Sequence, residues 1–135
     1  LNRELIGVYR ASGKTDALIK EQKIHAERNP RAGRAYVDLA KSNLGIKKYD
    51  DALAAYDAAI EHADSDRRRF KFKIEKARAL ELKGDYEAAE KLARILLGAA
   101  SNDRERRSAQ ESLIRLMKLQ DKASDMPNLA KEELM

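Results

Sequence analysis

Two short segments contain residue types found at phosphate and calcium sites. Residues 11–15 read Ala-Ser-Gly-Lys-Thr, like the end of a phosphate-binding loop, but that loop needs a glycine five residues before Gly13, where Val8 stands. Residues 64–66 read Asp-Ser-Asp, like the start of a calcium loop, but arginines occupy positions 68–69, where a ligand and a glycine are required. We therefore predict a turn between helices at the first segment and helix-capping oxygens at the second.

The remaining candidates for chemistry are the two histidines, His25 and His62. Neither has a second histidine, a cysteine or a carboxylate cluster at metal-ligand spacing, and each lies near the end of a predicted helix, where a partial positive charge is favourable. The chain has no cysteine, which excludes a disulfide framework, a thiolate metal site and a cysteine nucleophile. With no Ser-His-Asp signature and no carboxylate pair in an apolar setting, the sequence predicts no enzyme, no cofactor and no metal.

Composition favours helices. The 135 residues suit one domain, a hydrophobic share of 43% permits a core, and a charged share of 38% with a net charge of +5 indicates a long solvated surface. Two prolines and six glycines are too few for a sandwich or barrel. No apolar run approaches the roughly 20 residues that cross a bilayer. The first residue is not Met and no signal pattern follows, so we expect part of a longer protein, and the lack of cysteine fits the cytoplasm and the periplasm equally.

Breakers and apolar spacing predict eight helices. In 49–63 and 86–99 the apolar residues recur at the i, i+3, i+4, i+7 spacing of one helix face. The alternating segment 70–74 continues without a turn into helix formers, so we assign it to a helix. Asn29 is the expected N-cap before Pro30. The predicted helices are 1–12, 15–28, 31–46, 49–63, 66–83, 86–99, 103–120 and 126–134.

The turn residues recur at a nearly fixed period. Gly13, Lys47, Gly84 and Asp121 are separated by 34, 37 and 37 residues. After the second and third of these turns, apolar residues repeat at the same offsets, and the matched residues are Tyr49 with Tyr86, Ala52 with Ala89, Tyr56 with Ala93, and Ala59 with Leu96. Self-similarity at such a period is typical of a stacked helical repeat.

The segments Gly84-Asp85-Tyr86-Glu87-Ala88-Ala89 and 49–59 resemble the tetratricopeptide repeat, which carries Gly-x-Tyr, Ala, an aromatic and Ala on its second helix. The resemblance implies an all-α, right-handed superhelical solenoid of antiparallel helix pairs, with three to four repeats. Residues 1–135 then form a single domain with repeats at about 1–30, 31–65, 66–102 and 103–135. The chain departs from the family pattern where Lys73 replaces an aromatic residue and where Asp64 and Ser101 replace proline.

Close packing of such pairs needs small residues facing large ones. We expect buried alanines and core tyrosines at the repeat positions. They are Ala40, Ala52, Ala59, Ala77 and Ala89, and Tyr9, Tyr36, Tyr49, Tyr56 and Tyr86.

In the family, the first helices line a concave groove. Basic residues seven positions apart share a helix face, and such pairs recur at equivalent repeat positions. They suggest a row of cations along the groove, the basic ladder, that binds an acidic or extended peptide. The predicted partner-binding residues are Arg34, Lys41, Asn43, Lys71, Arg78 and Arg115. The alternative is an ordinary solvated face, in which Asp38 and Glu75 form i,i+4 ion pairs with these cations.

The sequence thus predicts a non-catalytic protein- or peptide-binding scaffold. Two alternatives stay open. The first alternative is a helical repeat that binds nucleic acid, which the arginine-rich segments 67–69 and 104–107 suggest. Against it, tyrosines that pack in a core are not available to stack on bases. The second alternative is a self-association module of a larger multidomain protein, in which the exposed ends of the repeat array form a homo-oligomer.

Overall fold

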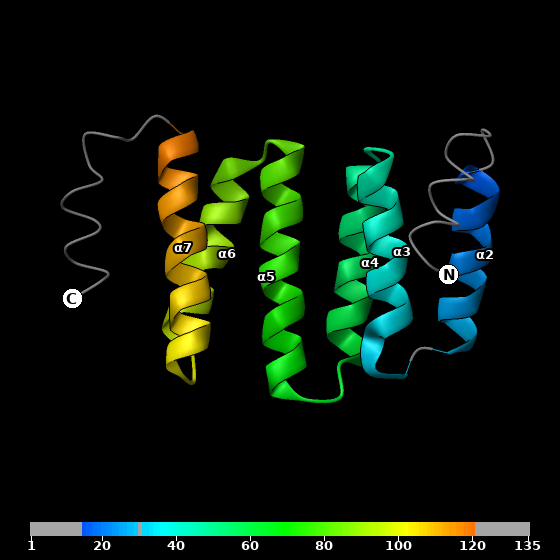
Figure 1. The fold of residues 1–135 in the computed structure, drawn as a ribbon, viewed down its shortest axis with the longest axis horizontal. Helices are drawn as coiled ribbons and strands as arrows, with labels where there is room; N and C mark the ends of the chain where they lie inside the picture. Colours follow the sequence, from blue (N-terminus) through cyan, green and yellow to red (C-terminus); the bar gives the residue numbers. More distant parts are fainter. Residues whose placement is uncertain (1–14, 30, 121–135) are drawn as a thin grey trace. The chain divides into compact units, whose positions relative to one another are not determined.

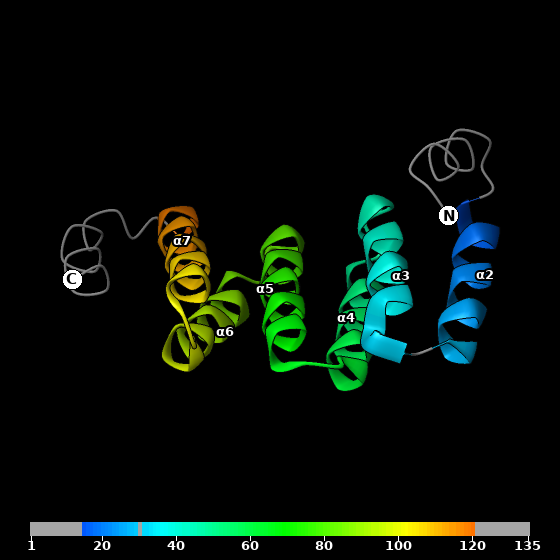
Figure 2. The same ribbon diagram turned by 60° about the horizontal axis from the view of Figure 1, so that its bottom comes forward.

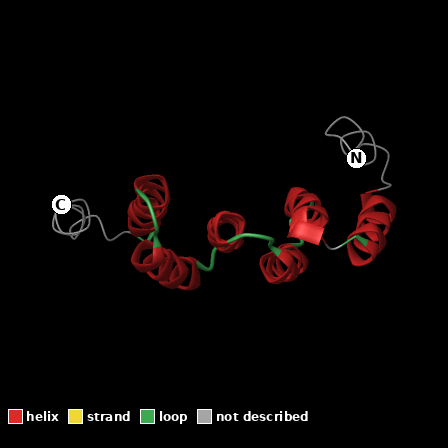
Figure 3. Ribbon diagram, turned by 90° about the horizontal axis from the view of Figure 1, so that it is seen from below, coloured by secondary structure: helices red, strands yellow, loops and turns green. Residues whose placement is uncertain are grey.

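The computed structural model describes residues 15–29 and 31–120, and all regular structure in this part of the chain is helical (Figure 3). The chain divides into two compact units, Leu1–Arg69 and Phe70–Met135. The predicted helices 1–12 and 126–134 lie outside the described residues, as do Tyr9, Gly13 and Asp121.

The first unit contains α2 (Thr15–Arg28), the short 3-10 helix η1 (Arg31–Gly33), α3 (Arg34–Gly45) and α4 (Tyr49–His62). Helix α3 packs along α4, and α2 packs against α3 (Figure 1). The contacts bury one apolar stripe of each helix, as the amphipathic spacing requires. The most buried of these residues are Leu18, Ala26, Ala40, Ala52, Tyr56 and Ala59.

The second unit contains α6 (Tyr86–Ala99), α7 (Asp103–Leu119) and all but the first turn of α5 (Asp66–Lys83). Helices α6 and α7 lie side by side (Figure 2). Leu96, Leu113 and Leu116 are fully buried in this unit. The alternating segment 70–74 is helical, as predicted, with Phe72 buried. Over the part of the chain described here, every helix is too short or too polar to cross a bilayer.

Helix boundaries follow the sequence prediction except before α3. Helices 15–28, 66–83 and 86–99 are confirmed, and the helices predicted at 31–46, 49–63 and 103–120 each end one residue early. The predicted helix 31–46 is divided: residues 31–33 form the 3-10 helix η1, and the α-helix α3 begins only after Gly33, which adopts a φ of 76°. The N-cap assignment of Asn29 is also wrong: its backbone N–H and its Nδ2 donate to the carbonyl oxygen of His25 at 2.9 and 3.2 Å, so Asn29 closes α2.

The predicted small-residue positions are confirmed. Ala40, Ala52, Ala59, Ala77 and Ala89 are all buried. Among the tyrosines, Tyr56 is buried, whereas Tyr36, Tyr49 and Tyr86 are half-buried. Tyr36 stacks on His62 at the end of α4, with ring centroids 5.5 Å apart.

The period of 37 residues is visible in the turns that follow α3 and α5. Lys47 and Gly84 both adopt positive φ, 63° and 93°. Lys47 N–H donates to the Leu44 carbonyl and Lys48 N–H to the Asn43 carbonyl, and Gly84 and Asp85 make the same two bonds to Glu81 and Leu80. Both turns are therefore Schellman motifs, whose αL residue normally is glycine.

The helices after these turns repeat the same geometry. Lys48 and Asp85 have φ/ψ of −87°/73° and −86°/70°, and Ala63 and Ala100 have −59°/135° and −62°/131°. The next helix begins in both copies with an aspartate–arginine pair three residues apart, Asp66–Arg69 and Asp103–Arg106, each at 2.7 Å. Residues 47–69 and 84–106 are thus two copies of one local structure, and adding 37 relates equivalent positions.

The two Schellman turns make a direct stability prediction. A Cβ in the αL conformation costs about 1 kcal/mol. Lys47→Gly should therefore raise the free energy of unfolding by about 1 kcal/mol. Gly84→Lys should lower it by a similar amount, because nothing but the backbone conformation opposes a side chain there. Urea unfolding followed by circular dichroism measures both, and shifts of the same sign in the two variants would contradict the equivalence.

Candidate binding surface

The structure exposes five of the six predicted partner-binding residues and buries the sixth. Arg34, Lys41, Lys71, Arg78 and Arg115 are exposed. Asn43 is only 3% exposed, so its assignment to the same surface is wrong. It lies nine residues after Arg34, which is two and a half helical turns and places it on the opposite side of α3.

Two members of the predicted basic ladder are held by a carboxylate that the sequence analysis did not single out. Glu81, with a side chain 4% exposed, pairs with Arg78 on its own helix and with Arg115 on α7, whose Nε lies 2.6 Å from Glu81 Oε1. The available sequence signal was the i,i+3 spacing of Arg78 and Glu81. The pairing offsets one positive charge and links α5 to α7.

The exposed face of α3 carries a mixed row of charges. Arg34, Asp38 and Lys41 follow the i, i+4, i+7 spacing and are all exposed, so they lie on one face of the helix. The three charges alternate in sign along this face. In the second unit, Lys71 is exposed on α5 as well, and no ion pair is recorded for it among the described residues.

A pocket of about 360 Å³ opens beside this row, between α2 and α3. Its lining carries hydrogen-bond acceptors: the carboxylates of Glu21 and Asp38, the ring of His25 and the amide of Gln22. Gln22 is 5% exposed, and its Oε1 has no hydrogen-bond partner within the described ranges. Asp38 thus belongs both to the row on α3 and to the pocket. We use the name α2/α3 surface for the residues of the row and the pocket together, which are Glu21, Gln22, His25, Arg34, Asp38 and Lys41.

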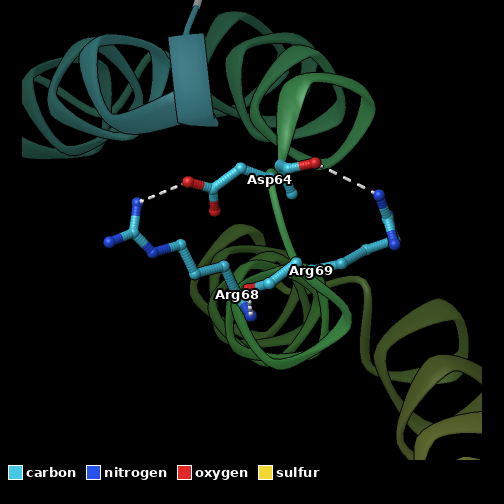
Figure 4. A network of polar contacts seen from close by, with 5 residues as sticks. Asp64, Arg68 and Arg69 are labelled. Carbon is cyan, nitrogen blue, oxygen red and sulfur yellow. Dashed lines mark hydrogen bonds and ion pairs between the residues drawn. The ribbon is translucent and has the colours of Figure 1, made fainter.

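The arginine run 67–69 is largely engaged in its own turn (Figure 4). Arg68 Nη1 lies 3.4 Å from Asp64 Oδ2, and Arg69 donates to the Ala63 carbonyl oxygen at 3.2 Å and to Asp66 Oδ1 at 2.7 Å. Ser65 Oγ accepts the Arg68 N–H, which confirms the predicted capping role of segment 64–66. These guanidinium groups order the start of α5 rather than forming an open cationic patch.

Within residues 15–29 and 31–120, no three histidine, cysteine or acidic side chains come together as a metal site would require. His25 is exposed near the end of α2, where its Nδ1 lies 3.3 Å from Asn29 Nδ2, and His62 is exposed at the end of α4. Both histidines therefore occupy the helix-end positions predicted from the sequence. No family model and no curated protein matches the chain.

Proposed function

We propose that the chain is a non-catalytic peptide-binding module built from tetratricopeptide-like helix pairs, and that it binds an extended segment along the α2/α3 surface. The repeated turns and helix boundaries support the family resemblance. The alternating row on α3, beside a pocket lined by acceptors, is the observation that carries the binding proposal.

The charges of this surface specify the segment. Arg34 and Lys41 can each pair with a carboxylate, whereas the exposed carboxylates of Glu21 and Asp38 can accept from an ammonium or guanidinium group. A matching peptide therefore carries a cationic side chain between two acidic ones. This refines the acidic partner predicted from the sequence, because Asp38 would repel a uniformly acidic chain.

Helix geometry fixes the spacing of the two acidic residues. Seven residues of α3 rise about 10 Å, and an extended chain in the polyproline II conformation advances about 3.1 Å per residue with three residues per turn. The carboxylates that meet Arg34 and Lys41 are thus about three residues apart in the peptide and point to the same side of it. A lysine between them faces Asp38.

Fluorescence anisotropy with synthetic peptides tests this proposal. The probe is a labelled peptide with two glutamates at that spacing and a lysine between them, and the comparison peptide exchanges every glutamate for lysine and every lysine for glutamate. We expect the first to bind more tightly, and Arg34→Glu with Lys41→Glu to weaken it about tenfold. Arg104→Glu with Arg107→Glu makes the same change in net charge at exposed positions of the second unit and should leave binding unaltered.

Equal binding of both peptides, or equal losses in the two double variants, would show that only net charge matters and would contradict the α2/α3 surface. A single-stranded oligonucleotide serves as a further probe. If it binds with a steep salt dependence and the peptides do not bind, the nucleic-acid alternative replaces this proposal.

A further inference from the structure

A second pocket, of about 260 Å³, lies in the first unit among α2, α3 and α4. Its α3 lining, which includes Tyr36, Leu39 and Asn43, occupies the helix face opposite Arg34 and Lys41. It is therefore distinct from the α2/α3 surface. Most of the lining is apolar, and the apolar lining residues are Ile19, Tyr36, Leu39, Ala54, Ala55 and Ala58.

Asn43 lines this pocket with a buried side-chain amide. Its Nδ2 donates to the Leu39 carbonyl oxygen at 3.1 Å, and this bond fixes the orientation of the amide, because the flipped amide would set two oxygens against each other. Its Oδ1 is buried and has no hydrogen-bond partner in the described part of the chain. A buried acceptor without a donor is unfavourable, so a ligand group that donates to this oxygen would stabilise the side chain.

The second copy of the repeat shows that the fold does not require this arrangement. The position equivalent to Asn43 is Leu80, whose carbonyl accepts the same turn hydrogen bond, and it is buried as well. The positions equivalent to Ala54, Ala55 and Ala58 hold Lys91, Leu92 and Ile95. The first copy thus combines a polar floor with three small residues where the second copy has large ones.

We propose that this pocket binds an aromatic side chain with an N–H or O–H on its ring, a tryptophan or tyrosine of a partner protein. The volume far exceeds the roughly 30 Å³ share of one water molecule and lies below the roughly 300–1,000 Å³ of whole small-molecule sites, so it fits one large side chain. The apolar walls and the ring of Tyr36 contact the aromatic body, and Asn43 Oδ1, which has almost no accessible surface, accepts its donor after a small shift of the side chains around it. Glu27 and Asp51, with Lys23, also line the pocket and favour a neighbouring basic residue in the partner.

The chain contains no tryptophan, so the fluorescence of an indole probe reports binding without background. The probe is N-acetyl-tryptophanamide, and the control is its 1-methylindole analogue, which keeps the ring and lacks the donor. We expect the wild type to bind the probe saturably and the methylated analogue about tenfold more weakly, as the loss of one buried hydrogen bond predicts.

Three variants separate this site from the α2/α3 surface. Asn43→Leu, which copies the residue of the second repeat, should remove the preference for the unmethylated probe. Ala54→Phe, at an exposed position, should block both probes. Arg34→Glu with Lys41→Glu should change neither.

The proposal is overturned by equal binding of the two probes to the wild type, by no saturable binding, or by unchanged binding in Ala54→Phe. Binding of free indole without binding of N-acetyl-tryptophanamide also overturns it, because the site would then take a small molecule rather than a side chain. Circular dichroism of each variant establishes that it is folded.

Discussion

Replacing Gly33 with alanine should destabilise the protein by about 3 kcal/mol or more. Two effects add at this position. Gly33 adopts a φ of 76°, which disfavours any L side chain, and its added Cβ would overlap the backbone carbonyl oxygen of Ala59 and lie 3.0 Å from the Ala59 Cα. The obstacle is the backbone of α4, which cannot turn aside as a flexible side chain can.

Urea unfolding measures this loss, with Gly98→Ala as the matched control. Gly98 lies within α6 with nothing within 4 Å of an added Cβ, so the same substitution should stabilise by about 0.5–1 kcal/mol. Combining Gly33→Ala with Ala59→Gly should not restore stability, because the overlap involves the carbonyl of Ala59. Rescue by Ala59→Gly, or equal effects of the two alanine variants, would show that the close approach of η1 to α4 is not the cause.

The helices that the sequence specifies are those whose ends are set by local signals. Ser65 and Asn102 accept backbone N–H groups at the starts of α5 and α7, and both residues are recognisable as caps from their types. The equivalence of Lys47 and Gly84 also follows from spacing alone. What spacing does not provide is the positive φ of Lys47, because a lysine carries no signal for that conformation.

The start of α3 depends on a contact made far along the chain. Pro30 after Asn29 is an ordinary sign of a helix start, and it favours the boundary that proved wrong. The actual boundary depends on Gly33, whose backbone lies so close to the backbone of Ala59 that no side chain fits between them. Such an approach is a tertiary property, and single-sequence reasoning detects the glycine without its partner.

The candidate binding surface likewise combines contacts that helical spacing predicts with contacts that only the tertiary structure creates. Helical periodicity correctly groups Arg34 and Lys41, and the same periodicity could have separated Asn43 from them, since nine residues reverse the face. By contrast, Glu81 and Arg115 are 34 residues apart, and only the arrangement of α5 and α7 brings them together. A row of cations read from sequence overstates the positive surface wherever a distant carboxylate joins it.

Removal of both arginines from Glu81 should lower the free energy of unfolding by about 3 kcal/mol. Arg78→Ala with Arg115→Ala leaves the Glu81 carboxylate buried without its two partners. The penalty comes from the desolvated charge rather than from lost attraction between exposed groups. It should therefore disappear when the charge itself is removed, and the triple variant with Glu81→Leu should recover most of the loss.

Urea unfolding of the single, double and triple variants gives the coupling among the three residues. Arg106→Ala provides the matched control, because the Arg106–Asp103 pair has the same chemistry with side chains 50% and 90% exposed, and it should change stability by about 0.5 kcal/mol or less. A triple variant less stable than the double variant would mean that Glu81 contributes through packing instead of charge. Because Arg78 and Arg115 pair with Glu81, their replacement would change stability as well as binding. Charge reversal at Arg34 and Lys41 leaves Glu81 paired, so these two residues are the ones to change in a binding test.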